Sequence, residues 1–547
     1  MPGLLTREVS ALMLLGDEAV ALGAVHAGIS GAYAYPGTPS TEILEALIAY
    51  SRSVGAPRAS WCANEKTAYE EALGMSMAGR RALVAMKHVG LNVAADPFMN
   101  SAVVAPKGGL VLAVADDPGM HSSQNEQDSR YYADFARIPC LEPATPQEAY
   151  EMTLEAFDIS ERFRTPVLLR LVTRLAHERA EVRPVEPRLE NPTDPIMNRK
   201  EWVLLPAFAR ENWKRRLEQS AEVREWSAGS EWNHLDISPG SSFGVITTGI
   251  ARNYYFDVVD DVEQKPSHLH VGAYPLPVGR IRELVSSVSE VLVLEEGYPY
   301  LERYLRGIIP PAVLIRGRES GDVPPDGELS QDLVRKALGL PSASGIVSRF
   351  PVPERPPRLC DGCPHTDAYD ALSTALEGFE APIVTSDIGC YTLGVLPPHS
   401  VGDSCVCMGA SVGMAKGASE AGVHPCVAVI GDSTFLHSGI TPLMDAITAD
   451  ANMTLIILDN DVVAMTGSQP TILPAEKLKD VVLGLGADPN HVCSFELHPR
   501  KVAELAELLR EEIDHRGLSV VIAHRACIEA VKKIKKSPAI NPKGESQ

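Results

Sequence analysis

The segment Val427-Ala-Val-Ile-Gly-Asp-Ser433 is an apolar strand that ends in a glycine and an acidic residue. A second strand of this kind, Thr454-Leu-Ile-Ile-Leu-Asp-Asn460, follows after a stretch of helical length. Strands that alternate with helices form parallel sheets, and the carboxyl ends of parallel strands meet at one edge of the sheet. We therefore expect Asp432 and Asn460 to lie side by side at such an edge.

This pair of strand ends suits a magnesium ion that binds a diphosphate. Mg²⁺ prefers oxygen ligands, usually one or two carboxylates together with the phosphates of a ligand. Asp432 supplies a carboxylate, Asn460 a neutral oxygen and Val462 a backbone carbonyl. Gly-Asp-Ser and Asp-Asn are also common in ordinary turns, so the spacing leaves that alternative open. A thiamine diphosphate (TPP) site holds its magnesium in such a pair, which indicates carbonyl chemistry.

Two further features fit a TPP site. Gly409, Gly413 and Gly417 recur every four residues, which gives one helix a smooth face for packing beside a bulky cofactor. Ordinary helix packing explains this stripe equally well. Glu65 precedes the Gly- and Ala-rich segment 72–79, where it could face an apolar cleft that raises its pKa. A buried carboxylate is needed to activate the aminopyrimidine ring of TPP, although a glutamate in a first helical turn more often interacts with the helix dipole.

Length and composition exclude several classes of protein. The 547 residues predict about three or four domains. Fifty basic and 71 acidic residues give a net charge of −21, which argues against a nucleic-acid-binding or anionic-membrane surface. No apolar run reaches the roughly 20 residues of a membrane span, and the N-terminus does not resemble a signal peptide, so we expect a cytoplasmic protein. Ten cysteines in so long a chain indicate ligands, nucleophiles or core residues rather than a disulfide framework.

Apolar runs alternate with amphipathic stretches in both terminal parts of the chain, which predicts α/β architecture. Pro-rich segments at 183–195 and 350–357 separate these parts from a smaller α/β region, which follows a helical stretch at 207–232. The predicted elements are a helix at 12–27 and strands at 82–86, 109–115, 243–248, 268–271, 291–295, 427–430, 454–458 and 519–523.

Several longer motifs carry a resemblance to a known family. They are Tyr35-Pro-Gly-Thr-Pro-Ser-Thr41, Asn64-Glu-Lys-Thr67, His121-Ser-Ser-Gln-Asn-Glu-Gln-Asp128, Cys360-Asp-Gly-Cys-Pro-His365, Asp387-Ile-Gly-Cys-Tyr-Thr-Leu-Gly394, Cys407-Met-Gly-Ala-Ser-Val-Gly413 and Gly431-Asp-Ser-Thr-Phe435. Over roughly residues 10–530 the chain resembles the α subunits of indolepyruvate:ferredoxin oxidoreductases, which are TPP-dependent 2-oxoacid:ferredoxin oxidoreductases. The resemblance implies oxidative decarboxylation of a 2-oxo acid with coenzyme A, which yields an acyl-CoA, carbon dioxide and two low-potential electrons. Aryl pyruvates such as indolepyruvate or phenylpyruvate are the implied substrates, and a smaller or branched 2-oxo acid is the alternative substrate.

The implied fold has two parallel-sheet TPP-binding domains and a transketolase C-terminal-like domain. The expected boundaries are 1–185 for the pyrimidine-binding domain, 186–235 for a linker, 236–345 for the transketolase C-terminal-like domain, 346–531 for the diphosphate-binding domain and 532–547 for a flexible tail.

The resemblance also assigns site residues. Glu65 matches the glutamate that activates the cofactor, and Thr38 matches a threonine that faces the substrate. Asp432, Asn460 and the Val462 carbonyl match the magnesium site. The remaining candidates for contact with cofactor or substrate are Gly409, Gly431, Ser433, His88, His365 and His437, although a lone histidine is more often structural.

Members of the family usually continue into a ferredoxin-like domain with Cys-x-x-Cys-x-x-Cys runs, which these 547 residues lack. The electrons therefore need another route of transfer away from TPP. Positions that hold a [4Fe-4S] cluster near TPP in the broader family match Cys360, Cys363, Cys390 and Cys527. A zinc site or buried thiols would be alternatives. Cys405 and Cys407 are substitute ligands for Cys390, whereas Cys62, Cys140, Cys426 and Cys493 are expected to be structural.

The resemblance implies partners as well. We expect a smaller β-type subunit, a ferredoxin or other low-potential electron acceptor, and a dimer of heterodimers. Two rival functions stay open at this point. One is a non-oxidative TPP-dependent decarboxylase or carboligase, and the other is a non-catalytic, zinc-stabilised subunit.

Overall fold

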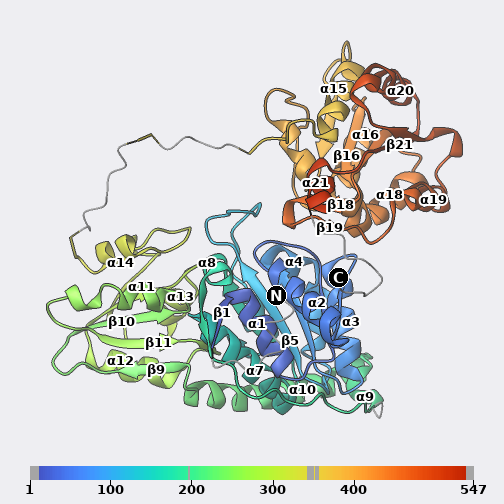
Figure 1. Ribbon diagram of the computed structural model, residues 1–547. Coiled ribbons are helices and arrows are strands. Elements are labelled where there is room, and N and C mark those ends of the chain that lie inside the picture. The colour runs from blue at the N-terminus through green and yellow to red at the C-terminus, as the bar shows by residue number, and fades with distance from the viewer. Residues whose placement is uncertain (1–10, 195–197, 342–349, 352–356, 537–547) are drawn as a thin grey trace, which may run out of the picture. The chain divides into compact units, whose positions relative to one another are not determined.

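The alternating apolar runs near the N-terminus form a seven-stranded sheet in the computed structural model of the chain (Figure 1). Its strands are parallel except for β12, which pairs antiparallel with β6 at one edge. The order is β12 (Ala273–Tyr274), β6 (Cys140–Leu141), β7 (Val167–Val172), β5 (Leu110–Asp116), β4 (Ala82–Lys87), β2 (Gly31–Ala34) and β3 (Arg58–Trp61).

Successive residues of these strands enter two different apolar cores. Leu83 and Val111 belong to one core, whereas Val84 and Leu112 belong to the other. Both faces of the sheet are therefore covered, as is usual for parallel sheets. The first core also contains α1 (Gly16–His26), α2 (Thr41–Val54), α7 (Pro146–Phe163) and α8 (Thr173–His177), and the second contains α3 (Glu65–Met77), α4 (His88–Val93), α5 (Ala95–Ser101) and α6 (Arg130–Ala136).

A five-stranded sheet follows in the same part of the chain. It is parallel apart from β9, which forms an antiparallel edge. The order is β14 (Leu314–Arg316), β13 (Glu290–Leu294), β10 (Phe243–Thr248), β11 (Ser267–Val271) and β9 (Asn233–Asp236). Along the chain, α9 (Arg199–Trp202) and α10 (Pro206–Gly229) precede these strands, α11 (Ala251–Phe256), α12 (Val278–Ser287) and α13 (Tyr300–Ile308) connect them, and α14 (Gln331–Ala337) follows them.

The C-terminal part has its own five-stranded sheet, which is parallel throughout. One face is covered by α15 (Pro364–Leu376) and α20 (Val502–Asp514), and the other by α16 (Ala410–Glu420), α18 (Ile440–Thr448) and α19 (Leu478–Gly484). The strand order is β15 (Ile383–Ser386), β16 (Cys426–Gly431), β17 (Met453–Asp459), β21 (Leu518–His524) and β20 (Val492–Glu496), and a separate ribbon pairs β18 (Val462–Val463) with β19 (Gln469–Pro470).

The chain divides into two compact units, the first of which holds the first two sheets. Unit 1 is Met1–Val347 and unit 2 is Ser348–Gln547. The first two sheets form one unit because both cores of unit 1 contain strand residues from each sheet, such as Leu83 and Val245. The structure describes residues 11–194, 198–341, 350–351 and 357–536.

Two expected elements differ from the structure. Leu12–Leu15 is not the start of a helix but strand β1, which pairs with β8 (Arg179–Val182). Its residues alternate in burial, a period of two that the apolar run concealed. The expected flexible tail also differs, because α21 (Ile528–Lys536) extends into it. The rest of that tail, 537–547, and most of the Pro-rich segment 350–357 lie outside the described residues.

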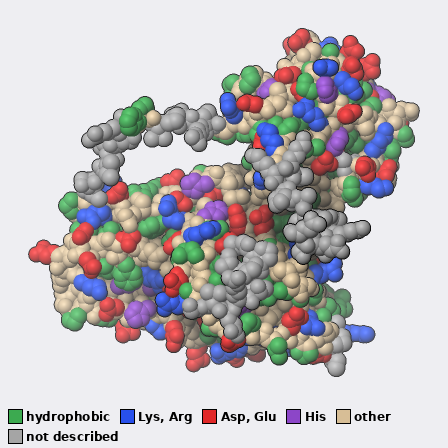
Figure 2. Space-filling view, in the orientation of Figure 1, with side chains coloured by type: hydrophobic (Ala, Val, Ile, Leu, Met, Phe, Trp, Pro, Cys, Tyr) green, Lys and Arg blue, Asp and Glu red, His purple; other side chains and the backbone are tan. Residues whose placement is uncertain are grey.

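The surface agrees with the charge balance of the sequence. Figure 2 shows basic and acidic side chains interspersed over the visible face, without a continuous basic area on that face. Among the described residues, no helix combines the length and the apolar character needed to cross a membrane.

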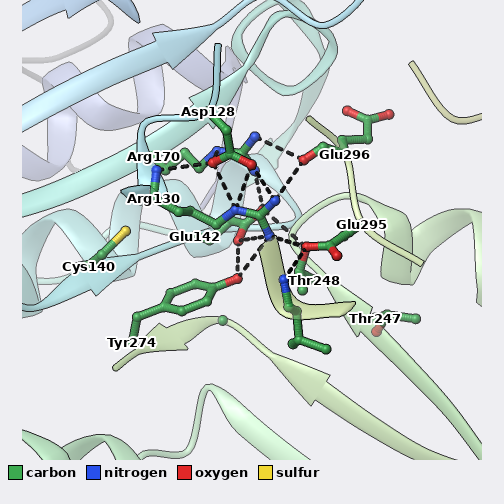
Figure 3. Close-up of polar contacts among 12 residues, drawn as sticks. Asp128, Arg130, Cys140, Glu142, Arg170, Thr247, Thr248, Tyr274, Glu295 and Glu296 are labelled. Carbon is green, nitrogen blue, oxygen red and sulfur yellow. Dashed lines mark hydrogen bonds and ion pairs between the residues drawn. The ribbon is translucent and has the colours of Figure 1, made fainter. Parts of the chain in front are cut away.

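A buried network of arginines and carboxylates joins the two sheets of unit 1 (Figure 3). Arg170 on β7 donates to Asp116 at 2.7 Å and to Glu142 at 2.5 Å. Arg130 on α6 donates to Asp128 through Nε at 2.9 Å. Although burial would raise the pKa of Asp128, the two guanidinium groups hold it below its ordinary value.

The same network includes the turn after β13, to which the sequence assigned no chemistry. Arg130 forms an ion pair of 2.9 Å with Glu295, and the carbonyl of Glu296 accepts from Arg130 at 3.1 Å and from Arg170 at 3.0 Å. Burial raises the pKa of the Glu296 carboxyl to about 7. The motif that ends at Asp128 therefore serves partly as a structural link, because buried charges require partners.

Candidate active site

The strands of unit 2 bring Asp432 and the segment after β17 together, as the spacing predicted. The register pairs Gly431 with Leu458, so β16 and β17 end at the same edge. Asp432 begins the short helix α17 (Asp432–Thr434) and accepts a hydrogen bond from the backbone N–H of Asp461 at 3.0 Å. Burial, and then the charge of Asp459, raises the pKa of Asp432 well above its usual value. A cation would relieve this repulsion between buried carboxyls.

The loop after β17 carries the other expected oxygen ligands. Asn460 is buried, and its side-chain oxygen accepts from the N–H of Val462 at 3.1 Å. Its amide nitrogen lies 3.4 Å from Nε2 of His365. Burial lowers the pKa of His365 to about 4, so that imidazole is neutral at physiological pH. Asp461 turns the loop with a φ of 68°, in the left-handed region that aspartate tolerates better than most residues.

A second oxygen-rich group lies on the same sheet edge and was missed from the sequence. His524 is the last residue of β21 and is the register partner of Asp459. Its Nδ1 lies 3.2 Å from an oxygen of Asp459. These two residues and Asp461 place ligand atoms within 4.8 Å of one another, and they line a cavity of about 470 Å³. The feature from which His524 could have been identified is its position at the end of a strand, beside Asp459.

The glycines of the expected stripe differ in what surrounds them. Gly409 lies before α16 with a φ of 88°, and a Cβ there would lie 2.6 Å from the carbonyl oxygen of Ser438. Gly417 is helical, and a Cβ there would meet nothing within 4 Å. Only the first glycine is therefore required by its surroundings. Its N–H and that of Ser411 donate to the buried carboxylate of Asp387 at 2.9 and 3.0 Å.

The other candidates beside Asp432 are also close-packed. A Cβ at Gly431 would lie 2.6 Å from the ring of Tyr391, so only glycine fits between β16 and that ring. Ser433 donates its N–H to Asp432 at 2.8 Å, which makes it part of the turn. His437 is buried, and its Nδ1 lies 2.6 Å from the hydroxyl of Ser438.

The structure brings the four predicted cysteines into one cluster. Burial, followed by the charges of the other three thiols, raises the pKa of Cys390 to about 12. The N–H of Cys363 donates to the carbonyl of Cys360 at 3.0 Å, so these two residues share a tight turn. Cys405 and Cys407 are exposed and act electrostatically on each other. The remaining four are Cys62, Cys140 and Cys426, which are buried, and the partly buried Cys493.

The cysteine cluster is tied to the Asp432 edge by backbone and side-chain bonds. The N–H of Cys527 donates to the carbonyl of Asn460 at 3.1 Å. Arg525 donates to the carbonyl of Gly362 at 2.8 Å and to Asp367 at 2.5 Å. The chain after β21 is therefore held to the Cys360–Cys363 turn. Sequence reasoning missed Arg525, whose only signal was its position two residues before Cys527.

Unit 1 has its own group of predicted residues at the carboxyl edge of its sheet. Thr38 follows β2, Glu65 follows β3 and His88 follows β4. These strands are adjacent and parallel. The hydroxyl of Ser122, from the loop after β5, donates to the carbonyl of Thr38 at 3.0 Å.

Glu65 begins α3 and is buried, with 4% of its surface exposed. Asn64 caps this helix by accepting the N–H of Thr67 at 2.9 Å. On the neighbouring helix α4, a Cβ at Gly90 would lie only 2.6 Å from a carboxylate oxygen of Glu65. The absence of a side chain at this glycine leaves room for the carboxylate.

Lys87 is a further functional candidate that the sequence did not reveal. Burial lowers the pKa of its ammonium group to about 8, while the charges of Asp117 and Glu65 oppose that shift. Its Nζ donates to the carbonyl of Ser122 at 2.8 Å, and its stem packs against Gly37 of the Thr38 loop. This edge of unit 1 thus combines a buried acid with a base that titrates near neutral pH.

His88 borders a cavity of about 410 Å³ on this side of unit 1. Its Nε2 lies 3.1 Å from the carbonyl oxygen of Asn125, and its Nδ1 is buried and has no hydrogen-bond partner within the described part of the chain. Tyr131, Tyr132 and Tyr298 line the same cavity. An aromatic or apolar group would fit such a lining.

Replacement of two of these glycines tests the close packing before α16. Gly409→Ala should lower the free energy of unfolding by more than the roughly 1–2 kcal/mol cost of a left-handed alanine, because Cβ also meets Ser438. Gly417→Ala is the matched control and should stabilise by up to about 1 kcal/mol through helix propensity. Chemical denaturation measures both changes. Equal effects of the two substitutions would contradict the assignment.

Two family models match this chain. The model described as "Pyruvate flavodoxin/ferredoxin oxidoreductase, thiamine diP-bdg" matches residues 22–207. The model described as "Thiamine pyrophosphate enzyme, C-terminal TPP binding domain" matches residues 387–523. These matches cover the strands of the seven-stranded sheet of unit 1 apart from β12, and those of the parallel sheet of unit 2 apart from β15. They confirm the predicted α/β, TPP-binding fold.

Whole-chain relatives agree. The chain is 38% identical to the indolepyruvate oxidoreductase subunit IorA of Archaeoglobus fulgidus over 94% of this chain and 86% of that protein. It is 37% identical to the subunit of the same name from Methanothermobacter thermautotrophicus over 95% and 88%. A solved 2-oxoglutarate:ferredoxin oxidoreductase from Magnetococcus marinus aligns with 56% of this chain and 62% of its own at 14% identity and a TM-score of 0.46, too low to add to the assignment. On the strength of the two full-length relatives, the chain belongs to the family of indolepyruvate oxidoreductase IorA subunits.

Proposed function

We propose that this protein oxidatively decarboxylates a 2-oxo acid, with an aryl pyruvate such as indolepyruvate or phenylpyruvate as substrate. The 2-oxo acid and coenzyme A would give an acyl-CoA, carbon dioxide and two electrons, which pass through a [4Fe-4S] cluster to ferredoxin or another low-potential acceptor. One observation carries the proposal. The cysteine cluster and the Asp432 edge are joined directly, because Cys527 donates its backbone N–H to the carbonyl of Asn460.

Unit 2 provides a donor set that suits Mg²⁺ and a diphosphate. Asp432, the side chain of Asn460 and the carbonyl of Val462 would hold the ion, since Mg²⁺ prefers oxygen ligands. The raised pKa of the buried Asp432 carboxyl fits a site that gains a cation. The N–H groups of Gly409 and Ser411 donate to Asp387, and these bonds would hold the start of α16 beside the bound diphosphate.

Unit 1 provides the proton chemistry. TPP, when bound, supplies the carbanion chemistry at the 2-oxo carbon. Glu65 would hold a proton at the aminopyrimidine ring nitrogen, and its burial makes that exchange possible without competition from bulk water. Thr38 would face the substrate, and Lys87 would pair with its carboxylate. The cavity beside His88 has the aromatic lining expected for an aryl group.

The four thiols support a cluster bound by cysteines, because Cys360, Cys363 and Cys527 all act electrostatically on Cys390. Four thiolates are the usual ligands of a [4Fe-4S] cluster. A four-cysteine zinc site uses the same ligands, and measurement of the iron and zinc content separates the two. Arg525 would position the Cys360–Cys363 turn against Cys527.

The proposal also includes the subunit assembly and the cellular location of this protein. The relatives are named as subunits, which supports a partner subunit. We propose that this partner is a smaller β-type subunit and that the assembly is a dimer of heterodimers. All ten cysteines are unpaired, which fits a reducing compartment and therefore a cytoplasmic location.

The cluster assignment is tested by Cys527→Ser. Under anaerobic purification with its partner subunit, the wild-type protein should contain iron and acid-labile sulfide, and its absorption should bleach when 2-oxo acid and coenzyme A are added. The variant should lose most of its iron and its acceptor reduction while TPP stays bound. Cys405→Ser is the control and should keep its iron, because that thiol lies outside the cluster.

Two results would overturn this assignment. Full iron in the Cys527→Ser variant would remove the fourth ligand. A wild-type protein with TPP and zinc but no iron would favour a non-oxidative decarboxylase or carboligase, or a zinc-stabilised subunit without turnover.

The magnesium site is tested by Asp432→Asn. Mg²⁺-dependent binding of TPP should weaken at least about tenfold, which is about 1.4 kcal/mol, because the charged ligand is lost. Isothermal titration calorimetry with and without Mg²⁺ measures the effect. Asp445→Asn, an exposed acid on α18, should leave the Kd unchanged. Unaltered affinity in the Asp432 variant would be incompatible with its role as a ligand.

The role of Lys87 predicts a pH dependence. Because its pKa is lowered to about 8, the ammonium form is present below that pH and is lost above it. KM for the 2-oxo acid should therefore rise above about pH 8 in the wild-type enzyme. In Lys87→Met, KM should be raised and flat across that range, whereas Lys87→Arg should keep a low KM to higher pH. A wild-type rise that persists in Lys87→Met would rule out this residue.

A further inference from the structure

Arg216 is a buried arginine with no hydrogen-bond partner among the described residues. It lies on α10 with only 1% of its surface exposed. All three of its guanidinium nitrogens, Nε, Nη1 and Nη2, are without a partner. Arg130 and Arg170, in contrast, have carboxylates and carbonyls around them. A buried charge without a partner is strongly unfavourable, so a group that pairs with Arg216 would stabilise the fold.

The neighbours of Arg216 make this environment more positive. The charges that act on it belong to Arg137 and Arg215 and, after burial, lower its pKa to about 10. Arg215 donates to the carbonyl of Val103 at 3.0 Å and to Asn212 at 3.2 Å. Arg137 lies over the ring of Trp213 at 5.9 Å. The surroundings therefore favour an anion and not another cation.

An adjacent cavity gives an anion room to bind. The buried face of α10 includes Arg216 and, one turn further on, Ser220. Ser220 lines a cavity of about 240 Å³ together with Arg130, Arg137, Arg224 and the acidic Asp134. Arg216 lies close to this lining, since the charge of Arg137 acts on it. The hydroxyl of Tyr304 donates to that acid, which reduces its repulsion of an anion. The volume is below the roughly 300–1,000 Å³ of pockets for drug-sized ligands, so it suits a phosphate group with a small attached fragment.

We propose that Arg216, Arg137 and Arg224 form a binding site for a phosphate group at the junction of α6 and α10. Guanidinium groups bind phosphate oxygens through paired N–H donors, which explains why arginines and not lysines gather here. The phosphate comes either from inorganic phosphate or from the 3′-phosphate of coenzyme A. The second source rests on the proposed function, whereas the site itself does not.

Titration calorimetry on the full-length chain tests the site and separates the two sources. Inorganic phosphate, coenzyme A and dephospho-coenzyme A, which lacks the 3′-phosphate, are the three probes. Coenzyme A as the source predicts binding at least about tenfold tighter than that of dephospho-coenzyme A. Inorganic phosphate as the source predicts that phosphate binds and that the two coenzyme forms do not differ. In either case Arg216→Met should weaken the bound probe at least about tenfold, and Arg183→Met, an exposed arginine, should not.

Thermal unfolding gives a second readout. The bound anion should raise the Tm of the wild-type chain and leave that of Arg216→Met unchanged, because the variant has no buried charge to pair. Should Arg216→Met fail to fold, Arg137→Gln at the exposed rim should show the same loss of binding.

The proposal is overturned if none of the three probes binds, or if binding survives in both variants. It is also overturned if the variants lose only their assembly with the smaller subunit, since a partner carboxylate would then satisfy Arg216. These readouts need neither iron nor turnover. Failure of the redox function would therefore be seen separately, as a protein that binds phosphate but contains no cluster.

Discussion

The parallel arrangement of strands is the constraint on which both candidate sites depend. In unit 2, β15, β16, β17 and β21 are neighbours in one parallel sheet, so the residues that follow them meet at a single edge. Asp387, Asp432, Asn460 and Cys527 come from four different strand ends in this way. In unit 1 the same rule places Thr38, Glu65 and His88 on adjacent strands. Backbone hydrogen bonding within the sheets therefore positions the chemistry.

Unit 1 contains two kinds of buried arginine, which differ in the groups around the guanidinium. Around Arg130 and Arg170, each guanidinium has carboxylates and carbonyls within hydrogen-bond distance, and the network links two sheets. Around Arg216 the part of the chain that the structure describes offers no hydrogen-bond partner, and other arginines are nearby. The first arrangement is complete without a ligand. In the second arrangement the guanidinium charge gains a partner only when an anion binds. This is the physical difference between a structural and a binding arginine.

Much of the site was predictable from local sequence. The strands at 427–430 and 454–458 lie within β16 and β17, and their ends meet as the spacing predicted. The four cysteines that the family resemblance pointed to lie close enough to act on one another electrostatically. The helix expected at 12–27 was wrong at its start, because Leu12–Leu15 pairs with a strand more than 160 residues away. Such pairing overrides a local helical pattern, and one sequence does not reveal it.

The sequence alone determined the alternation of strands and helices, the acidic net charge and the identity of the residues at each strand end, because these depend on local composition and spacing. The tertiary structure decided which groups face one another. It placed His524 beside Asp459, Arg525 on the Cys360–Cys363 turn, and Lys87 near Glu65. It also left Arg216 buried, with no hydrogen-bond partner from residues 11–194, 198–341, 350–351 or 357–536. These relations depend on burial and on contacts between distant segments, which arise only when the chain folds.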